Sequence, residues 1–299
     1  DFNLPNVNGN LAYIECANTT NLNLTGAMTI SAWMKGAAVD NAGGNAGGIG
    51  TTGGTNNRGY SLLRTTNNRV SFGIASLPNS THGVTSPTNS WKENEWNHVV
   101  GVFDPSSRLE VYLNGEFAAS ASAPSQQRSN YSFKIGQRGD ASPYYAYNWL
   151  GQLSNVSIWN TALSNGGASV GSVAGGEIAT LYNSGEPLQD LLTGPQNSNL
   201  LSWWKLDNIT TGIQDSKNAN NGTIVTTGSG LVSKFDQSVS TLNGLSSGMN
   251  QSNLVQSDLL TTSSYSPYAL NFDGNDIIDC GSDSSLTCLL YTSPSPRDS

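Results

Sequence analysis

The stretch WNHVVGVFDPSSRLEVYLNGE, residues 96–116, decides the fold of this chain. Apolar and polar residues alternate along 96–104 and again along 109–113, which is the period of half-buried β-strands. The Asp-Pro-Ser-Ser sequence between them favours a tight turn. Asn114-Gly115 then sends the chain back, because both residues tolerate the positive φ that a type I′ hairpin turn needs. The stretch therefore predicts an antiparallel sheet.

Alternating stretches and turn residues continue this pattern on both sides. One short helix is predicted at 176–183, where Ser184-Gly185 and Pro187 end it. Many short strands with one late helix predict an all-β fold, an antiparallel β-sandwich. The additional strands are expected at residues 29–35, 60–64, 69–75, 133–136 and 151–159.

The composition agrees with a β-rich protein. Of the 299 residues only 11% are charged and 33 are glycine, which suits many turns and polar strand faces. The formal net charge of −8 repels phosphate backbones, so we expect no nucleic-acid partner. No apolar run reaches the roughly 18 residues that cross a bilayer, so we expect no membrane insertion. For Cys16 and Cys280, burial as small apolar side chains is favoured over a disulfide or a metal site.

Several motifs, in their order along the chain, carry a resemblance to a known family. They are Thr-Ile-Ser-Ala-Trp at 29–33, W-x-H-V and Y-x-N-G within 96–115, Ile135-Gly136, residues 151–158, and Glu-Ile-x-x-Leu-Tyr at 177–182. From about residue 8 to 190 the chain resembles a laminin-G-like jellyroll domain of the concanavalin A-like lectin/glucanase superfamily, as found in marine microbial or phage surface proteins. The resemblance implies that the sandwich is a concanavalin A-like jellyroll.

One part of the sequence is repeated. Residues 8–16, NGNLAYIEC, are echoed by residues 273–280, DGNDIIDC, with one residue skipped. Repetition at this separation predicts tandem domains of one kind. LLSWWKLD at 200–207 also resembles the opening of another such unit.

The predicted organisation follows from the repeat. We expect a laminin-G-like jellyroll domain at 1–190 that lacks its opening segment, then a linker and the truncated, incomplete start of a second unit at 191–287. The second unit should be poorly ordered or lean on the first through Trp203-Trp204, because it cannot cover its own apolar faces. Residues 288–299, CLLYTSPSPRDS, interrupt the pattern, and we interpret them as a non-native tail; a natural Pro/Ser tail is the alternative.

An aromatic loop offers the candidate ligand-binding residues. In the sequence PYYAYNW at 143–149, Tyr144 and Tyr145 are expected to be exposed and to stack on sugar C–H faces. Asn148 and Asp140 could accept hydrogen bonds from sugar hydroxyls. Trp149 is expected to point into the core instead.

Calcium is the cofactor that the resemblance suggests, bound by oxygen ligands in loops at one rim of the sandwich. Asp40, Asp104 and Asp140 are the candidate ligands, and solvated turn residues are the alternative interpretation. The family's Asp-Glu after Gly-x-Ile is replaced here by Ser154-Asn155, which removes negative charge where a ligand could lie.

No catalytic residues are predicted. Retaining glycoside hydrolysis needs two carboxyl groups about 5–5.5 Å apart, and Glu93 and Glu95 lie in a polar turn before a strand. His98 lies within a strand, where the resemblance gives it a structural role. His82 lies in a loop without the neighbours of a Ser-His-Asp triad.

The sequence therefore predicts a non-catalytic carbohydrate- or protein-binding recognition module of a larger multidomain surface protein, an adhesin or a phage appendage. Its partners would be glycans or cell-surface or virion proteins, and its setting extracellular, on a cell surface or a virion. Tandem weak modules gain avidity through effective concentration. Two alternatives stay open: an accessory or divergent domain of a glycan hydrolase, and an architectural spacer without a ligand.

Overall fold

The computed structural model describes residues 2, 12–16, 21–36, 45–52, 58–76, 80–105, 107–124, 132–137, 149–208 and 211–226, with four three-residue strands between 245 and 279. The chain divides into two compact units, Asp1–Lys234 and Phe235–Ser299. In the second unit, β14 (Leu245–Ser247) pairs with β17 (Ile277–Asp279) and β15 (Leu254–Gln256) pairs with β16 (Tyr268–Leu270). In the described part of the chain, no helix is both long and apolar enough to cross a membrane.

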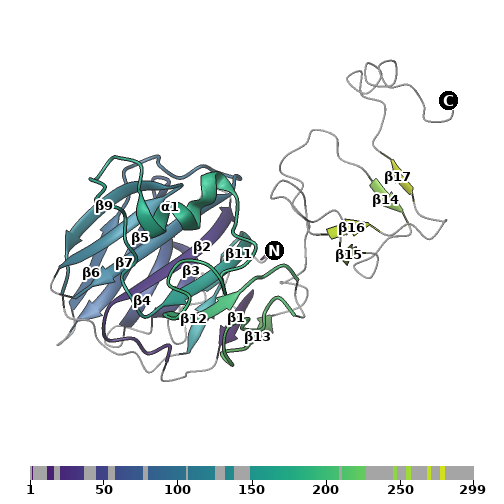
Figure 1. The fold of residues 1–299 in the computed structure, drawn as a ribbon, viewed down its shortest axis with the longest axis horizontal. Coiled ribbons are helices and arrows are strands. Elements are labelled where there is room, and N and C mark those ends of the chain that lie inside the picture. Colours follow the sequence, from purple (N-terminus) through teal and green to yellow (C-terminus); the bar gives the residue numbers. More distant parts are fainter. Residues whose placement is uncertain are drawn as a thin grey trace, which may run out of the picture. The chain divides into compact units, whose positions relative to one another are not determined.

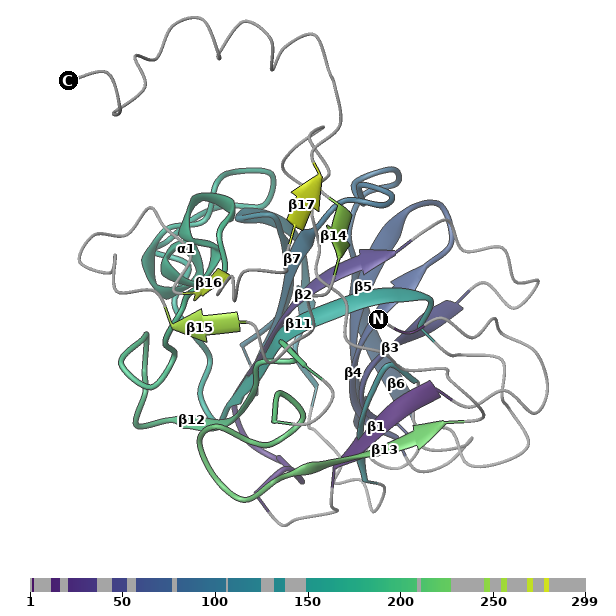
Figure 2. The ribbon, with the colours of Figure 1, turned by 90° about the vertical axis from the view of Figure 1, so that its right-hand side faces the viewer.

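The first unit is a sandwich of two antiparallel sheets (Figures 1 and 2). The six-stranded sheet has the order β12 (Leu200–Trp204), β11 (Gly151–Trp159), β2 (Met28–Gly36), β7 (Asn97–Asp104), β8 (Arg108–Leu113), β9 (Glu116–Ser122). The seven-stranded sheet has the order β13 (Gly222–Thr226), β1 (Ala12–Cys16), β10 (Phe133–Ile135), β3 (Asn45–Thr52), β4 (Arg58–Thr65), β5 (Arg69–Ser76), β6 (Ser80–Thr85). The short helix α1 (Gly176–Tyr182) continues into the 3-10 turn η1 (Asn183–Gly185). The all-β sandwich with one short helix is confirmed.

The hairpin that decided the fold has the predicted turn. Asn114 and Gly115 both have positive φ, 52° and 78°, so β8 returns directly as β9. The turn lies against the end of α1, where a Cβ on Gly115 would come within 2.4 Å of the Tyr182 ring. Glycine is therefore required at this position for both its backbone conformation and its size.

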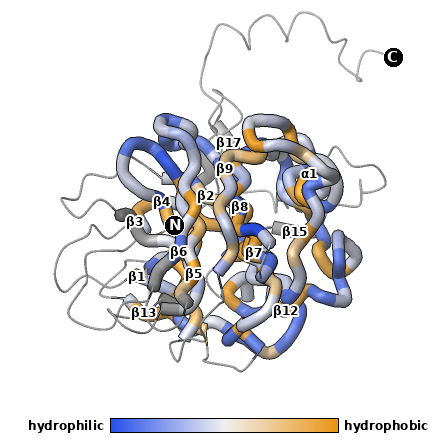
Figure 3. The backbone as a smooth tube through the Cα atoms, turned by 90° about the vertical axis from the view of Figure 1, so that its left-hand side faces the viewer, coloured by the Kyte–Doolittle hydropathy of each residue, from blue (hydrophilic) through white to orange (hydrophobic). Residues whose placement is uncertain are grey.

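Two apolar clusters lie on opposite faces of the six-stranded sheet. The first fills the space between the sheets, with residues such as Ile30, Phe72 and Phe103. The second lies between the outer face of the sheet and α1, and includes Trp159 and Ile178. Figure 3 shows apolar, orange residues along α1 and along strands of the sandwich. The sheet is thus buried on both faces, which explains why all but the last residue of β7 are buried.

Residues 200–226 complete the first sandwich. β12 pairs with β11 (Ser157 opposite Trp203), and β13 pairs with β1 (Glu15 opposite Thr223). The boundary predicted at residue 190 therefore differs from the structure, because these residues belong to the compact unit that ends at Lys234.

The two tryptophans of β12 show why this strand belongs to the first sandwich. Trp204 is fully buried and stacks on Phe133 at 5.1 Å between ring centroids, and Trp203 is 2% exposed. Both tryptophans, which were predicted to be the point of contact with the first unit, lie within that unit. Cys16 is a free, buried thiol, and burial raises its pKa well above the ordinary value. Residues 288–299 lie outside the described residues.

Candidate functional site

One end of the sandwich gathers loops from both sheets; we call it the loop rim. In the six-stranded sheet, β2 ends at Gly36 directly opposite Gly151, where β11 begins. In the seven-stranded sheet, β3 begins at Asn45 opposite Thr65, where β4 ends. The loop 86–96 joins the two sheets here, because the Asn94 N–H donates to the Gly36 carbonyl at 3.0 Å and the Trp91 N–H to the Asn68 carbonyl at 2.9 Å.

A buried cation and two indoles lie beneath this rim. Arg64 is 2% exposed, its guanidinium carbon lies 5.2 Å from the Trp91 ring centroid, and its Nη2 donates to the Asn68 side chain at 3.0 Å. Glu93 lies 3.8 Å from the same nitrogen. Burial lowers the pKa of Arg64 to about 10 against the opposing effect of Glu93, so the side chain is charged at neutral pH. Trp91 meets Trp149 edge to face at 5.9 Å.

Three buried donors of this cluster have no acceptor among the described residues: Arg64 Nε, Trp91 Nε1 and Trp149 Nε1. Leaving a buried donor unpaired costs about 1–3 kcal/mol. The backbone of Trp149 also links the two sheets, since its main-chain N–H donates to the Gly136 carbonyl at 2.6 Å. It is 1% exposed, as predicted for a core residue. The cluster therefore forms a rigid, donor-rich floor to the loop rim.

The candidate ligand-binding residues Asp140, Tyr144, Tyr145 and Asn148 lie outside the described residues, and so does the calcium candidate Asp40. The residues that flank them are described. Segment 37–44 joins Gly36 to Asn45, and segment 138–148 joins Gln137 to Trp149. Because all four flanking residues lie at the loop rim, both segments are attached there.

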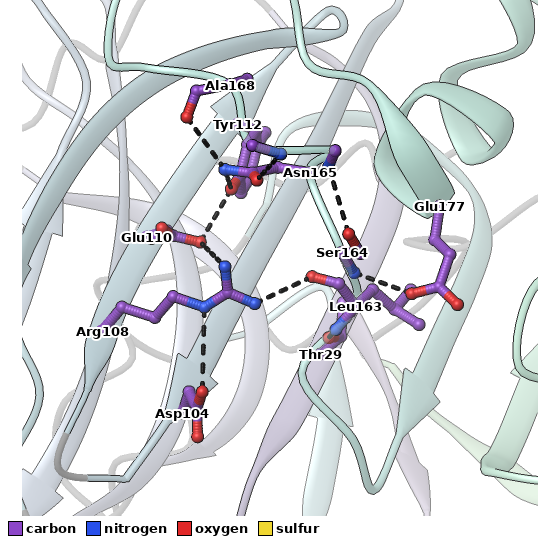
Figure 4. A network of polar contacts seen from close by, with 12 residues as sticks. Thr29, Asp104, Arg108, Glu110, Tyr112, Leu163, Ser164, Asn165, Ala168 and Glu177 are labelled. Carbon is purple, nitrogen blue, oxygen red and sulfur yellow. Dashed lines mark hydrogen bonds and ion pairs between the residues drawn. The ribbon is translucent and has the colours of Figure 1, made fainter.

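Asp104 lies at the opposite end of the sandwich, where β7 ends and Met28 pairs with Phe103. Its carboxylate is 3.9 Å from Arg108 Nε, and Arg108 also lies 3.7 Å from Glu110 and donates to the Leu163 carbonyl at 3.3 Å (Figure 4). The Arg108 guanidinium thus lies beside this partly exposed carboxylate, and the calcium role of Asp104 stays a prediction. Among the described residues, no group of three or more His, Cys, Asp or Glu side chains could hold a metal. The calcium role of Asp40 and Asp140 stays a prediction.

The network in Figure 4 continues through Glu110, which is 4% exposed. The Tyr112 hydroxyl donates to Glu110 at 2.7 Å and accepts a hydrogen bond from the Asn165 amide at 2.9 Å. Burial, followed by the bond to Glu110, raises the pKa of Tyr112, so it remains a donor. Two of the three carboxylates labelled in Figure 4, Asp104 and Glu110, share one arginine, and the third, Glu177, accepts a hydrogen bond from the Ser164 backbone N–H at 2.7 Å. The arrangement ties the loop after β11 to β8 and offers no free carboxylate pair for glycoside hydrolysis.

A serine and a histidine meet on the outer face of the six-stranded sheet. Ser31 Oγ and His98 Nε2 are 2.8 Å apart, and the two residues are 3% and 2% exposed. Burial lowers the pKa of His98 to about 3, so its ring is neutral at physiological pH. Trp33 and Tyr182 pack around it, with ring centroids 4.9 and 6.0 Å away. A small hollow lies beside them, with room for about one water molecule.

This pair lacks the features of a hydrolytic site. The described contacts of His98 include no carboxylate, which a Ser-His-Asp arrangement needs to orient the imidazole. Both side chains lie beneath α1, out of reach of a polymer substrate. The sequence did not reveal this pair, because the contact depends on the register of β2 and β7, in which Trp33 lies opposite His98. The structural role expected for His98 fits this geometry.

The two sheets, the late helix and the loop rim define a lectin-like jellyroll. A family model described as the concanavalin A-like lectin/glucanases superfamily matches residues 8–166, which is more than half of the chain. The chain belongs to this superfamily, and the resemblance found in its motifs is confirmed.

A comparison with solved structures found the native heptameric SAP-like pentraxin from Limulus polyphemus. It is 16% identical, the alignment covers 60% of this chain and 79% of that chain, and the TM-score is 0.46. A comparison with curated proteins found no match.

Proposed function

We propose that this chain is a non-catalytic recognition module that binds glycans or protein partners at the loop rim. It would serve as one unit of a larger multidomain surface protein, an adhesin or a phage appendage, in an extracellular, cell-surface or virion setting. The observation that carries the proposal is that segments 37–44 and 138–148, which hold every candidate ligand-binding residue, are attached at one rim of a rigid sandwich. Binding residues are commonly presented in this way, on loops that a rigid scaffold positions.

The floor of the rim supports this proposal. Arg64, Trp91 and Trp149 are all less than 4% exposed and hold the ends of the loops through side-chain and backbone contacts. A fixed floor lowers the ordering cost that a ligand must overcome. Tyr144 and Tyr145 would then supply flat faces for a sugar ring, and Asn148 and Asp140 would accept its hydroxyl protons.

Three of the carboxylates that the structure describes face an arginine. Glu93 faces Arg64, and Asp104 and Glu110 face Arg108. A glycosidase uses a pair of carboxyl groups that flank the scissile bond, and these three side chains face guanidinium groups instead. The hydrolase alternative would therefore rely on carboxylates other than these three.

A glycan array probed with the full chain, with and without calcium, tests the proposal. The double variant Tyr144→Ala/Tyr145→Ala should lose about tenfold or more in affinity, because each ring–sugar contact is worth about 1 kcal/mol. Asn148→Ala should also weaken binding. Asn160→Ala is the matched control, since Asn160 is exposed and follows the far end of β11.

The calcium arm decides whether Asp40 and Asp140 take part. Binding that depends on calcium and is lost in Asp140→Asn would assign them a metal. Absence of binding to glycans in both arms would rule out the glycan-binding form of the proposal and favour a protein partner or a spacer.

A further inference from the structure

Residues 200–226 form a segment that closes the sandwich; we call it the closing segment. It supplies β12, the edge strand of the six-stranded sheet, and β13, the edge strand of the seven-stranded sheet. In both views β13 lies beside β1 (Figures 1 and 2). Because each strand lies at a sheet edge and has one strand neighbour, the segment can leave without breaking any other strand pair.

The closing segment carries its own polar organisation. The Asp215 carboxylate, on a residue 8% exposed, accepts hydrogen bonds from the Ser202 hydroxyl and from the N–H groups of Trp203, Lys217 and Asn220, at 2.9 to 3.2 Å. The Asn220 amide in turn donates to Ser202 Oγ at 2.7 Å. All these partners belong to the segment, so its buried carboxylate is satisfied without a contribution from the rest of the sandwich.

The sandwich in turn presents a specific acceptor for this segment. Phe133 receives the Trp204 ring, and the Asn155 side chain accepts a hydrogen bond from Trp203 Nε1 at 3.0 Å. Gly222 fits against Ile14, where an added Cβ would lie only 2.3 Å from Ile14 Cγ2. The acceptor is therefore selective for glycine at the start of β13.

The chain contains a second copy of the acceptor strand. β13 pairs with Ile14, Glu15 and Cys16, and the echo at 273–280 places Ile278, Asp279 and Cys280 at the corresponding positions. Ile277–Asp279 is itself a strand, β17. One closing segment thus lies in the sequence between two β1-like strands, and in this structure it serves the first.

We propose that the closing segment is exchangeable between copies of this chain. It completes the sandwich of its own chain, as in this structure, and the β1 and β11 edges of a second copy can receive it instead, so that copies interlock. Exchange preserves the strand pairs and buried contacts of residues 200–226. The connection 186–199 must change its path, which alters the packing of Leu191 and the hydrogen bond from Trp159 Nε1 to the Pro195 carbonyl. The occupant of the acceptor edges is in both cases the same segment, from the same or another copy.

The experiment uses the full chain with a specific protease site inserted between Asn197 and Ser198, which are both exposed. After cleavage the two pieces should elute together, since the segment is held by both sheets. A fluorescent synthetic peptide of residues 198–226 is then added, and its anisotropy is followed against the concentration of cleaved chain. We expect saturable uptake that is much slower with uncleaved chain, where the tethered segment competes at high effective concentration.

Two peptide variants make the test specific. The Gly222→Ala peptide should bind about tenfold or more weakly, because overpacking of this size costs about 1–3 kcal/mol. The Thr223→Ala peptide is the matched control and should bind like the unmodified peptide, since Thr223 is exposed.

Three outcomes would overturn the proposal. The first is a cleaved chain that retains its own segment and takes up no peptide before it unfolds. The second is separation of the pieces with the remaining sandwich still folded. The third is equal binding of both variant peptides, which would indicate non-specific adhesion.

Discussion

Replacing Trp204 by alanine tests whether the sandwich extends to residue 226. Trp204 is fully buried, stacks on Phe133 at 5.1 Å and donates from Nε1 to the Asn220 carbonyl at 2.9 Å. Removing a buried tryptophan typically costs about 3–5 kcal/mol of unfolding free energy. This range includes the loss of the hydrogen bond to the carbonyl of Asn220, which is also buried. We expect a loss of about 4 kcal/mol in the unfolding free energy, out of the roughly 5–15 kcal/mol that stabilises a domain.

The loss is measurable by guanidinium denaturation of the full chain, followed by far-ultraviolet circular dichroism. For a domain of this size 1 kcal/mol corresponds to about 2–4 °C in Tm, so the melting temperature should fall by about 10 °C. Trp204→Phe keeps a ring against Phe133 and should cost only about 1–3 kcal/mol. Thr223→Ala, on the exposed face of β13, should change the unfolding free energy by less than about 0.5 kcal/mol.

Which unfolding transition moves matters as much as how far the unfolding free energy falls. If residues 200–226 belong to the sandwich, the main transition itself moves in Trp204→Ala. A main transition that stays in place while a separate minor one disappears would refute this reasoning and restore a boundary near residue 190.

Three further predictions concern polar groups of the sandwich. Burial lowers the pKa of His98 from 6.5 to about 3, so the unfolded chain takes up the proton first as the pH falls. The unfolding free energy should therefore fall by about 1.4 kcal/mol per pH unit between about pH 6 and 4. The same slope in the His98→Gln variant would contradict this. Tyr112→Phe removes the hydroxyl that donates to the buried Glu110 carboxylate, and it should lower the unfolding free energy by about 1–3 kcal/mol in a denaturant titration. An unchanged unfolding free energy would mean that this hydrogen bond contributes nothing. Asp104→Asn should leave any calcium heat in titration calorimetry unchanged, because Arg108 already faces this carboxylate; loss of that heat would make Asp104 a ligand.

Local features of the fold were predictable because their physical causes are local. The Asn114-Gly115 turn requires positive φ at two adjacent residues, and few sequences allow it. The helix predicted at 176–183 ends at Tyr182, since Asn183 takes the left-handed conformation that ends helices.

The residues of the closing segment were predicted to open a second unit, and the structure pairs them with the first sandwich for a non-local reason. β13 pairs with Ile14 and Cys16, and the echo at Ile278 and Cys280 offers the same side chains. Strand pairing depends on which partner the rest of the chain brings near, and the residues of β13 do not encode that choice. The sequence therefore indicated a repeated motif but not which sandwich the residues of β13 complete.

The same limit applies to the polar clusters. Tyr60, Leu62 and Arg64 alternate on one face of β4, so a buried arginine at the end of that strand was predictable from its spacing. Its contact with Trp91 was not, because the loop 86–96 must first cross from one sheet to the other. The Ser31–His98 pair likewise depends on the register between strands that lie 67 residues apart.

The distribution of burial also determines where recognition can occur. Apolar clusters cover most of both faces of the six-stranded sheet, which leaves little of either face open to a ligand. On the seven-stranded sheet, the row that alternates with the core residues contains Ser61, Gly73 and Gly83, paired side by side across three strands. Such small side chains offer a flat surface without the large anchors on which binding energy depends. The loop rim combines a buried floor with the segment that carries Tyr144 and Tyr145, and it is there that we propose recognition occurs.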